Sequence, residues 1–137
     1  MNDLTVAIAF KGNCTKAIEF YEKVFDTEVA FVNHYNPEDV PGGFENLVSF
    51  AMMEIAGKSI MFNDSFDGDK YSGDDKYTKG NHMSLVVSGD DLAQLQEWFA
   101  RLEKSGKKII SFEKNDAGQW FGIVADKFGV IWQFGMM

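Results

Sequence analysis

The chain has 137 residues, with 13 Lys plus Arg against 21 Asp plus Glu, and its formal net charge is −8. Hydrophobic residues make up 45% and aromatic residues 15%, a composition that excludes a disordered chain and predicts one packed domain. The negative charge disfavours nucleic acid as a partner, because phosphate backbones are also negative. No apolar run reaches the ~20 residues of a membrane span, so we expect no membrane association.

The cysteine content and the N-terminus bear on the cellular compartment. The single cysteine, Cys14, excludes an internal disulfide framework and fits a reducing compartment. Residues 1–4 lack the basic start and long apolar stretch of a secretory signal. We therefore expect a cytoplasmic protein.

The first half of the chain predicts a strand, a helix and three further strands. Apolar residues at helical spacing predict a helix over residues 14–25, and Asn13 is a suitable N-cap for it. Proline and paired glycines predict a loop over residues 35–45. The predicted strands are residues 5–10, 28–34, 46–55 and 58–62, with a turn at Ala56-Gly57 between the last two.

A long polar connection follows, over about residues 65–80, and it separates a first module (about 1–64) from a second (about 81–137). Loops of this length are usually functional or mobile. The aspartates of this acidic linker do not have EF-hand spacing, and no glutamate closes a loop. We therefore expect a solvated lid or connector in place of a calcium site. The aspartates in and beside this linker are Asp64, Asp67, Asp69, Asp74 and Asp75.

The second half repeats the pattern of the first. Asp90 or Asp91 is expected to cap a helix that runs through Lys104, with Gly106 as its terminator. The predicted strands are residues 82–87, 108–113, 120–125 and 130–136. Each half therefore predicts the order strand, helix, strand, strand, strand, and Gly57 and Gly129 precede corresponding last strands.

Three stretches of the sequence resemble a known family. They are residues 8–21 (IAFKGNCTKAIEFY), 55–61 (IAGKSIM) and 126–132 (DKFGVIW). They are similar to PhnB-type proteins of the vicinal oxygen chelate superfamily, which also holds glyoxalase I, bleomycin-resistance proteins and extradiol dioxygenases. The resemblance covers nearly the whole chain. It implies an α+β fold in which two paired βαβββ modules form one domain over residues 1–137, usually in a homodimer.

The resemblance also implies where a metal would bind. Metal-dependent members place ligands on the first and last strand of each module, which here correspond to Thr5, Met61, His82 and Gln133. Threonine and methionine are weak ligands for a divalent cation, and glutamine carries no charge. His82 and Gln133 are therefore weak candidate ligands, and we expect no metal and no other cofactor. Asn63 and Asp64 lie close enough in sequence for a shifted register to supply a carboxylate.

We expect instead an apolar cleft that takes a small molecule. Its predicted contacts are two polar side chains and three apolar ones, namely His82, Gln133, Met61, Trp120 and Trp132. Cys14 lies at the N-terminus of the first predicted helix, where a thiolate is favoured, but no adjacent base supports a nucleophile, so we expect a packed thiol. His34 is expected at the surface.

Three functions fit these features. The first is metal-free binding of a small apolar or aromatic molecule, with no catalysis. The second is drug sequestration like that of the bleomycin-resistance group, which the acidic charge permits by attracting cationic compounds. The third is a metal-dependent glyoxalase-like lyase or dioxygenase. We expect the first. The ubiquinone-pathway methyltransferase label of many PhnB-type sequences has no support here, because no glycine-rich strand-to-helix turn is present for S-adenosylmethionine.

Overall fold

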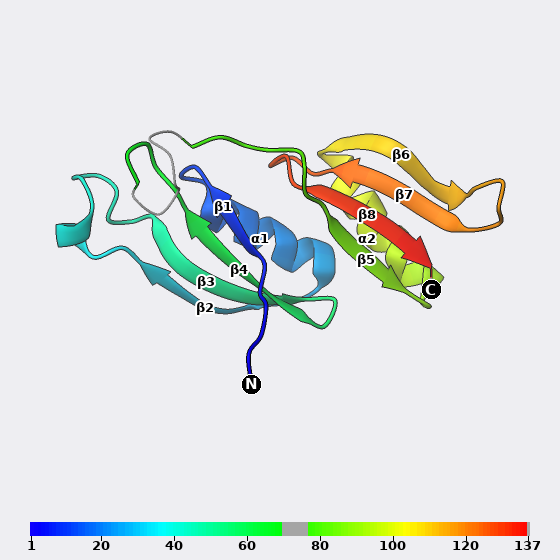
Figure 1. The fold of residues 1–137 in the computed structure, drawn as a ribbon, viewed down its shortest axis with the longest axis horizontal. Helices are drawn as coiled ribbons and strands as arrows, with labels where there is room; N and C mark the ends of the chain where they lie inside the picture. Colours follow the sequence, from blue (N-terminus) through cyan, green and yellow to red (C-terminus); the bar gives the residue numbers. More distant parts are fainter. Residues whose placement is uncertain (70–76, 137) are drawn as a thin grey trace. The chain divides into compact units, whose positions relative to one another are not determined.

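A computed structural model of the chain describes residues 1–69 and 77–136. The chain divides into two compact units, Met1–Thr78 and Lys79–Met137. Each unit holds a four-stranded sheet and one α-helix (Figure 1), which confirms the predicted α+β class and the repeated βαβββ order. Of the linker aspartates, Asp74 and Asp75 lie outside the described residues.

The first unit has strands in the spatial order β1-β4-β3-β2. Strands β1 and β4 run parallel, and the other neighbouring pairs run antiparallel. A single turn of 3-10 helix, η1, lies in the loop that the prolines and glycines predict. The elements are β1 (Ala7–Phe10), α1 (Cys14–Phe25), β2 (Val29–His34), η1 (Pro37–Asp39), β3 (Val48–Ile55) and β4 (Lys58–Asp64).

The second unit repeats this topology, with strands in the order β5-β8-β7-β6 and with β5 and β8 parallel. Gly57 and Gly129 both adopt left-handed backbone angles, with φ of +80° and +88°, at the turns that precede β4 and β8. The elements are β5 (Leu85–Gly89), α2 (Leu92–Lys104), β6 (Lys107–Lys114), β7 (Trp120–Ala125) and β8 (Ile131–Met136).

Three predicted strands start too early: β1 and β3 begin two residues later than predicted, at Ala7 and Val48, and β5 begins three residues later. The start of β5 bears on the site. Strand β5 begins at Leu85, so His82 and Met83 lie before it and are exposed. Leu85 pairs with Trp132 in a parallel register, and that register would place His82 beside Gly129. Because Gly129 turns the chain with a positive φ, β8 offers no extended partner to His82.

Helix α1 covers one face of the first sheet, and aromatic rings fill the space between them. The rings of Tyr21 on α1 and Phe62 on β4 stack with centroids 5.8 Å apart, and Phe10 on β1 stacks on Phe62 at 6.2 Å. In the second unit Phe99 on α2 contacts Phe134 edge-on at 5.5 Å. Each helix therefore buries one face of its own sheet.

Asp64, the last residue of β4, joins three elements of the first unit. Its carboxylate accepts hydrogen bonds from the backbone N–H of Cys14 (2.9 Å) and of Val48 (3.0 Å), and the residue is 1% exposed. The hydroxyl of Tyr35 donates to its carbonyl oxygen at 2.8 Å. Asn13 occupies the N-cap position of α1, but its side chain makes no capping hydrogen bond. Asp64 therefore supplies the cap that Asn13 does not.

We expect Asp64→Ala to lower the free energy of unfolding by about 2–4 kcal/mol, because two buried N–H groups lose a charged acceptor. Asp64→Asn should lose about half as much, since it keeps one side-chain acceptor. Asp116→Ala, at an exposed turn residue, is the matched control and should change stability by less than about 0.5 kcal/mol. Urea denaturation measures all three. Equal stability of Asp64→Ala and Asp116→Ala would contradict the capping role.

Candidate functional site

Opposite α1, the first sheet presents a second face, which we call the open face. Successive side chains of a strand point to opposite faces, so Phe62 and Asp64 point toward α1 while Met61 and Asn63 point to the open face. Met61 and Asn63 are half-buried. In the register, Met61 lies beside Ala7 of β1 and Met52 of β3. The open face is therefore largely apolar along its centre.

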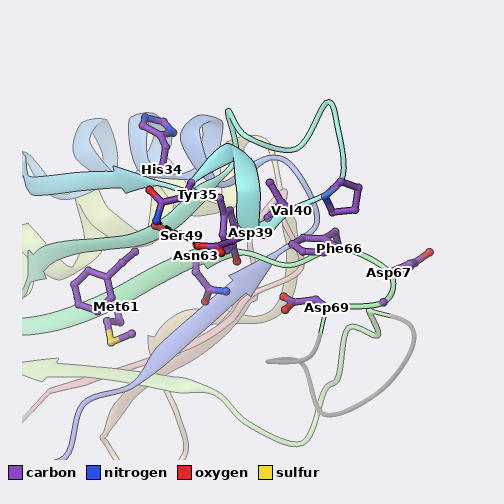
Figure 2. Close-up of a pocket in the computed structure, with 14 residues that line it drawn as sticks. His34, Tyr35, Asp39, Val40, Ser49, Met61, Asn63, Phe66, Asp67 and Asp69 are labelled. Carbon is purple, nitrogen blue, oxygen red and sulfur yellow. Dashed lines mark hydrogen bonds between the residues drawn. The ribbon is translucent and has the colours of Figure 1, made fainter.

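A cavity of about 870 Å³ lies at the end of this face (Figure 2). The C-terminal ends of β2 and β4, the first part of β3, and the loops that follow β2 and β4 contribute its walls. Its lining residues are His34, Tyr35, Asn36, Asp39, Val40, Pro41, Ser49, Phe50, Met61, Asn63, Phe66, Asp67, Gly68 and Asp69. This volume is in the range of small-molecule sites.

Aromatic rings form the apolar part of the cavity wall. Phe66 stacks on Phe44 with ring centroids 5.1 Å apart, and Tyr35 meets Phe66 edge-on at 5.8 Å. Phe50 stacks on Phe31 at 5.3 Å with the rings 10° from parallel. Because each of these lining rings packs on a neighbour, the wall is held in place before any ligand binds.

The polar part of the wall is also held by hydrogen bonds within the protein. The Nδ1 of His34 lies 2.9 Å from the carbonyl oxygen of Asn46. Asn36 donates its amide to the Asp39 carboxylate at 3.3 Å. Asp69 is buried and accepts a hydrogen bond from Ser65 at 3.1 Å. These bonds orient polar groups around the cavity.

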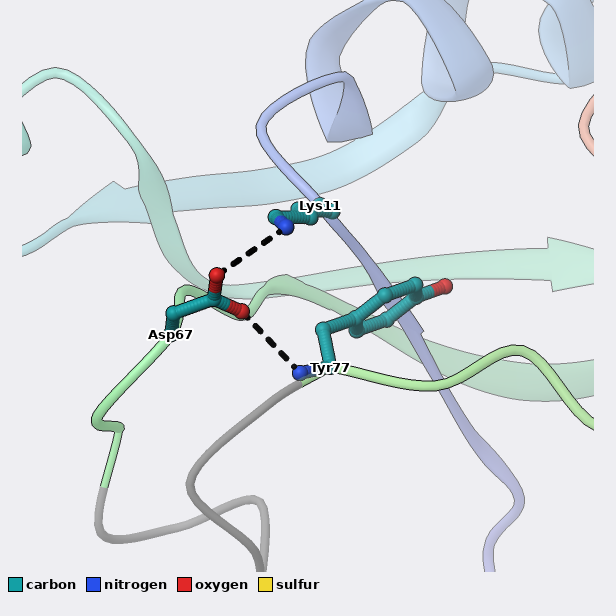
Figure 3. Close-up of polar contacts among 3 residues, drawn as sticks. All are labelled: Lys11, Asp67 and Tyr77. Atoms are coloured by element: carbon teal, nitrogen blue, oxygen red, sulfur yellow. Dashed lines mark hydrogen bonds and ion pairs between the residues drawn. The ribbon is translucent and has the colours of Figure 1, made fainter.

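Asp67 anchors the loop after β4 to two other segments (Figure 3). Its carboxylate pairs with the ammonium of Lys11 at 3.3 Å and accepts the backbone N–H of Tyr77 at 3.2 Å. The Tyr77 hydroxyl donates to the carbonyl of Ala9 on β1 at 2.8 Å, and burial raises the pKa of this phenol. Both partners of the ion pair are about half exposed, so the pair positions the loop and adds little stability.

Cys14 is fully buried at the start of α1, which agrees with the packed thiol that we expected. Burial, with the nearby Asp64 carboxylate, raises the pKa of this thiol to about 12. Burial also raises the pKa of the Asp64 carboxyl. The hydrogen bonds from the N–H groups of Val48 and Cys14 lower this pKa, but burial has the larger effect. A thiol with so high a pKa carries almost no thiolate at neutral pH. Cys14 therefore serves the core.

The five residues predicted to contact a small molecule are distributed over both units. Met61 lines the cavity. Trp132 is 1% exposed, and its Nε1 donates to Asp126 at 3.0 Å, so it is a core residue of the second unit. Trp120 is half-buried against Phe112, with ring centroids 5.5 Å apart.

The two polar candidates of the second unit are separated by the strand boundary. Gln133 lies on β8, where its Nε2 donates to Ser84 Oγ at 3.1 Å. His82 lies two residues before Ser84 and is exposed. The side chain that contacts Gln133 is thus Ser84.

The register also corrects the correspondence between the modules. Met61 pairs with Ala7, and Gln133 pairs with Val86, so Ala7 corresponds to Val86. Two residues earlier in each module, Thr5 therefore corresponds to Ser84 and not to His82. The resemblance implies ligands at Thr5, Met61, His82 and Gln133, and the register replaces His82 by Ser84 in this set. The four positions that correspond in the structure are therefore Thr5, Met61, Ser84 and Gln133.

This set of side chains does not fit a divalent metal, because none of the four carries a charge or an imidazole. Asp64 does not rescue a ligand, since it points toward α1 and accepts two backbone N–H groups there. Within residues 1–69 and 77–136, no three His, Cys, Asp or Glu side chains lie close enough together to hold a metal ion.

Most of the cavity was not predicted from the sequence. Residues 35–45 were expected to form a loop, and this loop provides Asp39, Val40 and Pro41 to the cavity wall. A usable signal was present in the aromatic and acidic residues at the two loops, around Tyr35 and Phe66. Contacts between loops distant in sequence are not given by periodicity, however, and only the fold brings them together.

The paired βαβββ topology is the fold of solved proteins described as members of the glyoxalase/bleomycin resistance/dioxygenase family. A solved structure from Bacillus cereus described as a putative 3-demethylubiquinone-9 3-methyltransferase, PhnB protein, is 26% identical, with a TM-score of 0.79 over 99% of this chain and 100% of that one. A glyoxalase/bleomycin resistance protein/dioxygenase family enzyme from Burkholderia phytofirmans shares the fold at 13% identity, with a TM-score of 0.67 over 96% and 95%.

Sequence comparison identifies the family within this class. A profile described as 3-demethylubiquinone-9 3-methyltransferase matches residues 2–135, and the chain belongs to this PhnB-like family. Protein YjdN of Escherichia coli (strain K12) is 26% identical over 148 residues, which cover 98% of this chain and 95% of YjdN. Among the described residues, no helix is long and apolar enough to cross a membrane.

The environment of Cys14 predicts a dependence of stability on alkaline pH. The ordinary thiol pKa of 9.0 applies to the unfolded chain, and in the folded protein it is about 12. The unfolded state therefore loses its proton first, so the free energy of unfolding falls as the pH rises from 9 toward 12, by up to roughly 1 kcal/mol per pH unit. Cys14→Ala should lack this component.

Urea denaturation at several pH values from 8 to 11 measures the difference between the two proteins. The tyrosines and lysines, which also titrate in this range, are common to both and cancel. Parallel pH profiles would contradict a buried, protonated Cys14 thiol.

Proposed function

We propose that this protein binds a small molecule with an apolar or aromatic body in the cavity of the first unit, without a divalent metal. The observation that carries the proposal is the make-up of the cavity wall. Met61, Phe50 and Phe66 give it apolar surface, and oriented polar groups surround them. Ligand sites in proteins have this composition, in which apolar contacts supply affinity and a few polar groups fix orientation.

The proposed ligand would lie on the open face with its apolar body against Met61 and Phe50. These side chains come from neighbouring strands, β4 and β3, in which Met61 pairs with Met52. A flexible thioether adapts to ligands of different shapes, while the stacked Phe50 ring offers a rigid surface. The contacts predicted from the sequence at Gln133, His82 and Trp120 stay predictions for the second unit and are not part of this site.

Binding without chemistry is supported by the groups present at the site. The single thiol of the chain, Cys14, is buried, and its raised pKa keeps it protonated at neutral pH. The described lining residues include carboxylates, amides and one imidazole, but none of the described bonds joins that imidazole to a carboxylate or a nucleophile. The arrangement resembles a recognition surface more than an acid–base pair.

The family name describes a methyl transfer. A site for the methyl donor S-adenosylmethionine would need a glycine-rich turn between a strand and a helix. The turn between β1 and α1 holds one glycine, Gly12, and the turn between β5 and α2 begins after Gly89. Gly42 and Gly43 lie in an exposed loop, where an added Cβ would meet no atom within 4 Å. These turns give no support to a glycine-rich site for S-adenosylmethionine, so we assign no methyl transfer.

We expect the neutral fluorescent probe N-phenyl-1-naphthylamine to bind to the wild-type protein, because its apolar body fits the open face. Met61→Ala should weaken this binding at least fivefold, since about 1–2 kcal/mol of apolar contact is lost. Fluorescence titration measures the affinity. Met83→Ala, at an exposed methionine of the second unit, is the matched control and should leave the affinity unchanged. No saturable binding to the wild type, or equal effects of both substitutions, would contradict the proposed site.

We also expect the chain to hold no stoichiometric divalent metal, because the four corresponding positions carry no charged ligand. After incubation with Zn²⁺, Ni²⁺ or Mn²⁺ and desalting, elemental analysis should find less than about 0.1 ion per chain. Chelator treatment should leave the probe affinity within twofold. One retained ion per chain, lost in Gln133→Ala or His82→Ala, would favour a metal-dependent enzyme.

A further inference from the structure

The hydrogen bonds around the cavity restrict the kind of ligand that it can accept, an inference that rests on the function proposed above. Polar side chains of the wall direct their donor hydrogens to acceptors within the protein. Tyr35 donates its hydroxyl hydrogen to the carbonyl of Asp64 at 2.8 Å, and Asn63 donates its amide to the same carbonyl at 3.3 Å. Asn36 donates to Asp39 at 3.3 Å. The Tyr35 hydroxyl hydrogen and one N–H of each amide are therefore engaged within the protein.

His34 shows the same bias through its tautomer. Its Nδ1 lies 2.9 Å from the carbonyl oxygen of Asn46, and a carbonyl oxygen can only accept. The Nδ1 therefore carries the hydrogen, and in the neutral ring Nε2 is an acceptor. The amide of Asn63 is oriented in the same way, because one N–H of its Nδ2 donates to the Asp64 carbonyl, and its Oδ1 is left as an acceptor beside the second N–H.

Carboxylates add charge to these acceptors. Asp39, Asp67 and Asp69 all line the cavity (Figure 2), and the lining residues that the structure describes include no lysine or arginine. Lys11 reaches Asp67 from outside the lining and offsets one of the three charges. The cavity therefore combines an aromatic and thioether surface with acceptors of net negative charge.

We propose that the ligand is a protonated amine with an aromatic body. Its ring lies against Met61 and Phe50, and its ammonium N–H groups donate toward Asp39 and the acceptors beside it. A carboxylate or phosphate on the ligand would meet acceptors and like charge, so anionic compounds are excluded from this position. Charge-assisted hydrogen bonds of this type are stronger than those between neutral groups.

The test compares four compounds with one indole body at pH 7, each displacing N-phenyl-1-naphthylamine from the wild-type protein. Tryptamine carries an ammonium, 3-methylindole no charge and indole-3-propionate a carboxylate. N,N,N-trimethyltryptammonium carries the positive charge without ammonium hydrogens. We expect tryptamine to bind at least tenfold more tightly than 3-methylindole and at least threefold more tightly than the quaternary compound, with indole-3-propionate weakest.

Asp39→Asn should reduce the preference for tryptamine over 3-methylindole at least threefold while leaving probe binding intact. Asp116→Asn removes the same charge from an exposed turn of the second unit and should preserve the preference. An equal loss in both variants would show a general charge effect and overturn the proposal. The proposal would also be overturned if tryptamine bound no more tightly than 3-methylindole or the quaternary compound. If the probe itself binds in these cases, the proposed function stands; if the probe does not bind, the proposed function fails.

Discussion

A four-stranded sheet has two faces, and each unit of this chain has one α-helix with which to cover them. In the first unit α1 covers the face that carries Phe62, through its stacking contact with Tyr21. The alternation of side chains along β4 then places Met61 and Asn63 on the face without a helix. The apolar open face is thus a direct consequence of the βαβββ order, and the cavity forms where loops close around its end.

The two helices show how far local sequence patterns determine structure. Asp91 caps α2 from the position that the sequence indicates, accepting the N–H of Gln94 at 3.1 Å. Asn13 occupies the same position before α1, but the N–H of Cys14 is bonded to Asp64, which lies 50 residues further along the chain. A residue type at a helix start predicts the boundary well in both cases. It cannot predict which acceptor binds the free N–H groups, because competition from distant carboxylates depends on the complete fold.

The repeated modules were predictable because hydrophobic periodicity and turn glycines are local, and Gly57 and Gly129 both have the expected left-handed conformation. The alignment between the first strands of the two modules was harder to predict. A strand ends where its partner ends, so β5 excludes His82 although the residues around it have strand character. Most of the cavity escaped prediction for a related reason: Tyr35 and Phe66 are 31 residues apart, and nothing in either loop alone indicates that their rings meet.

The two units differ at the end of the sheet where the first unit has its cavity. Met61 and Gln133 occupy corresponding positions, but one is an apolar thioether and the other an amide bonded to Ser84. The loop after β2 in the first unit contains η1 and closes around the end of the sheet, whereas β6 and β7 are joined by a short turn at Asn115–Gly118. Two copies of one fold can therefore differ in the loop and the side chains at the end of the sheet, without any change in strand order.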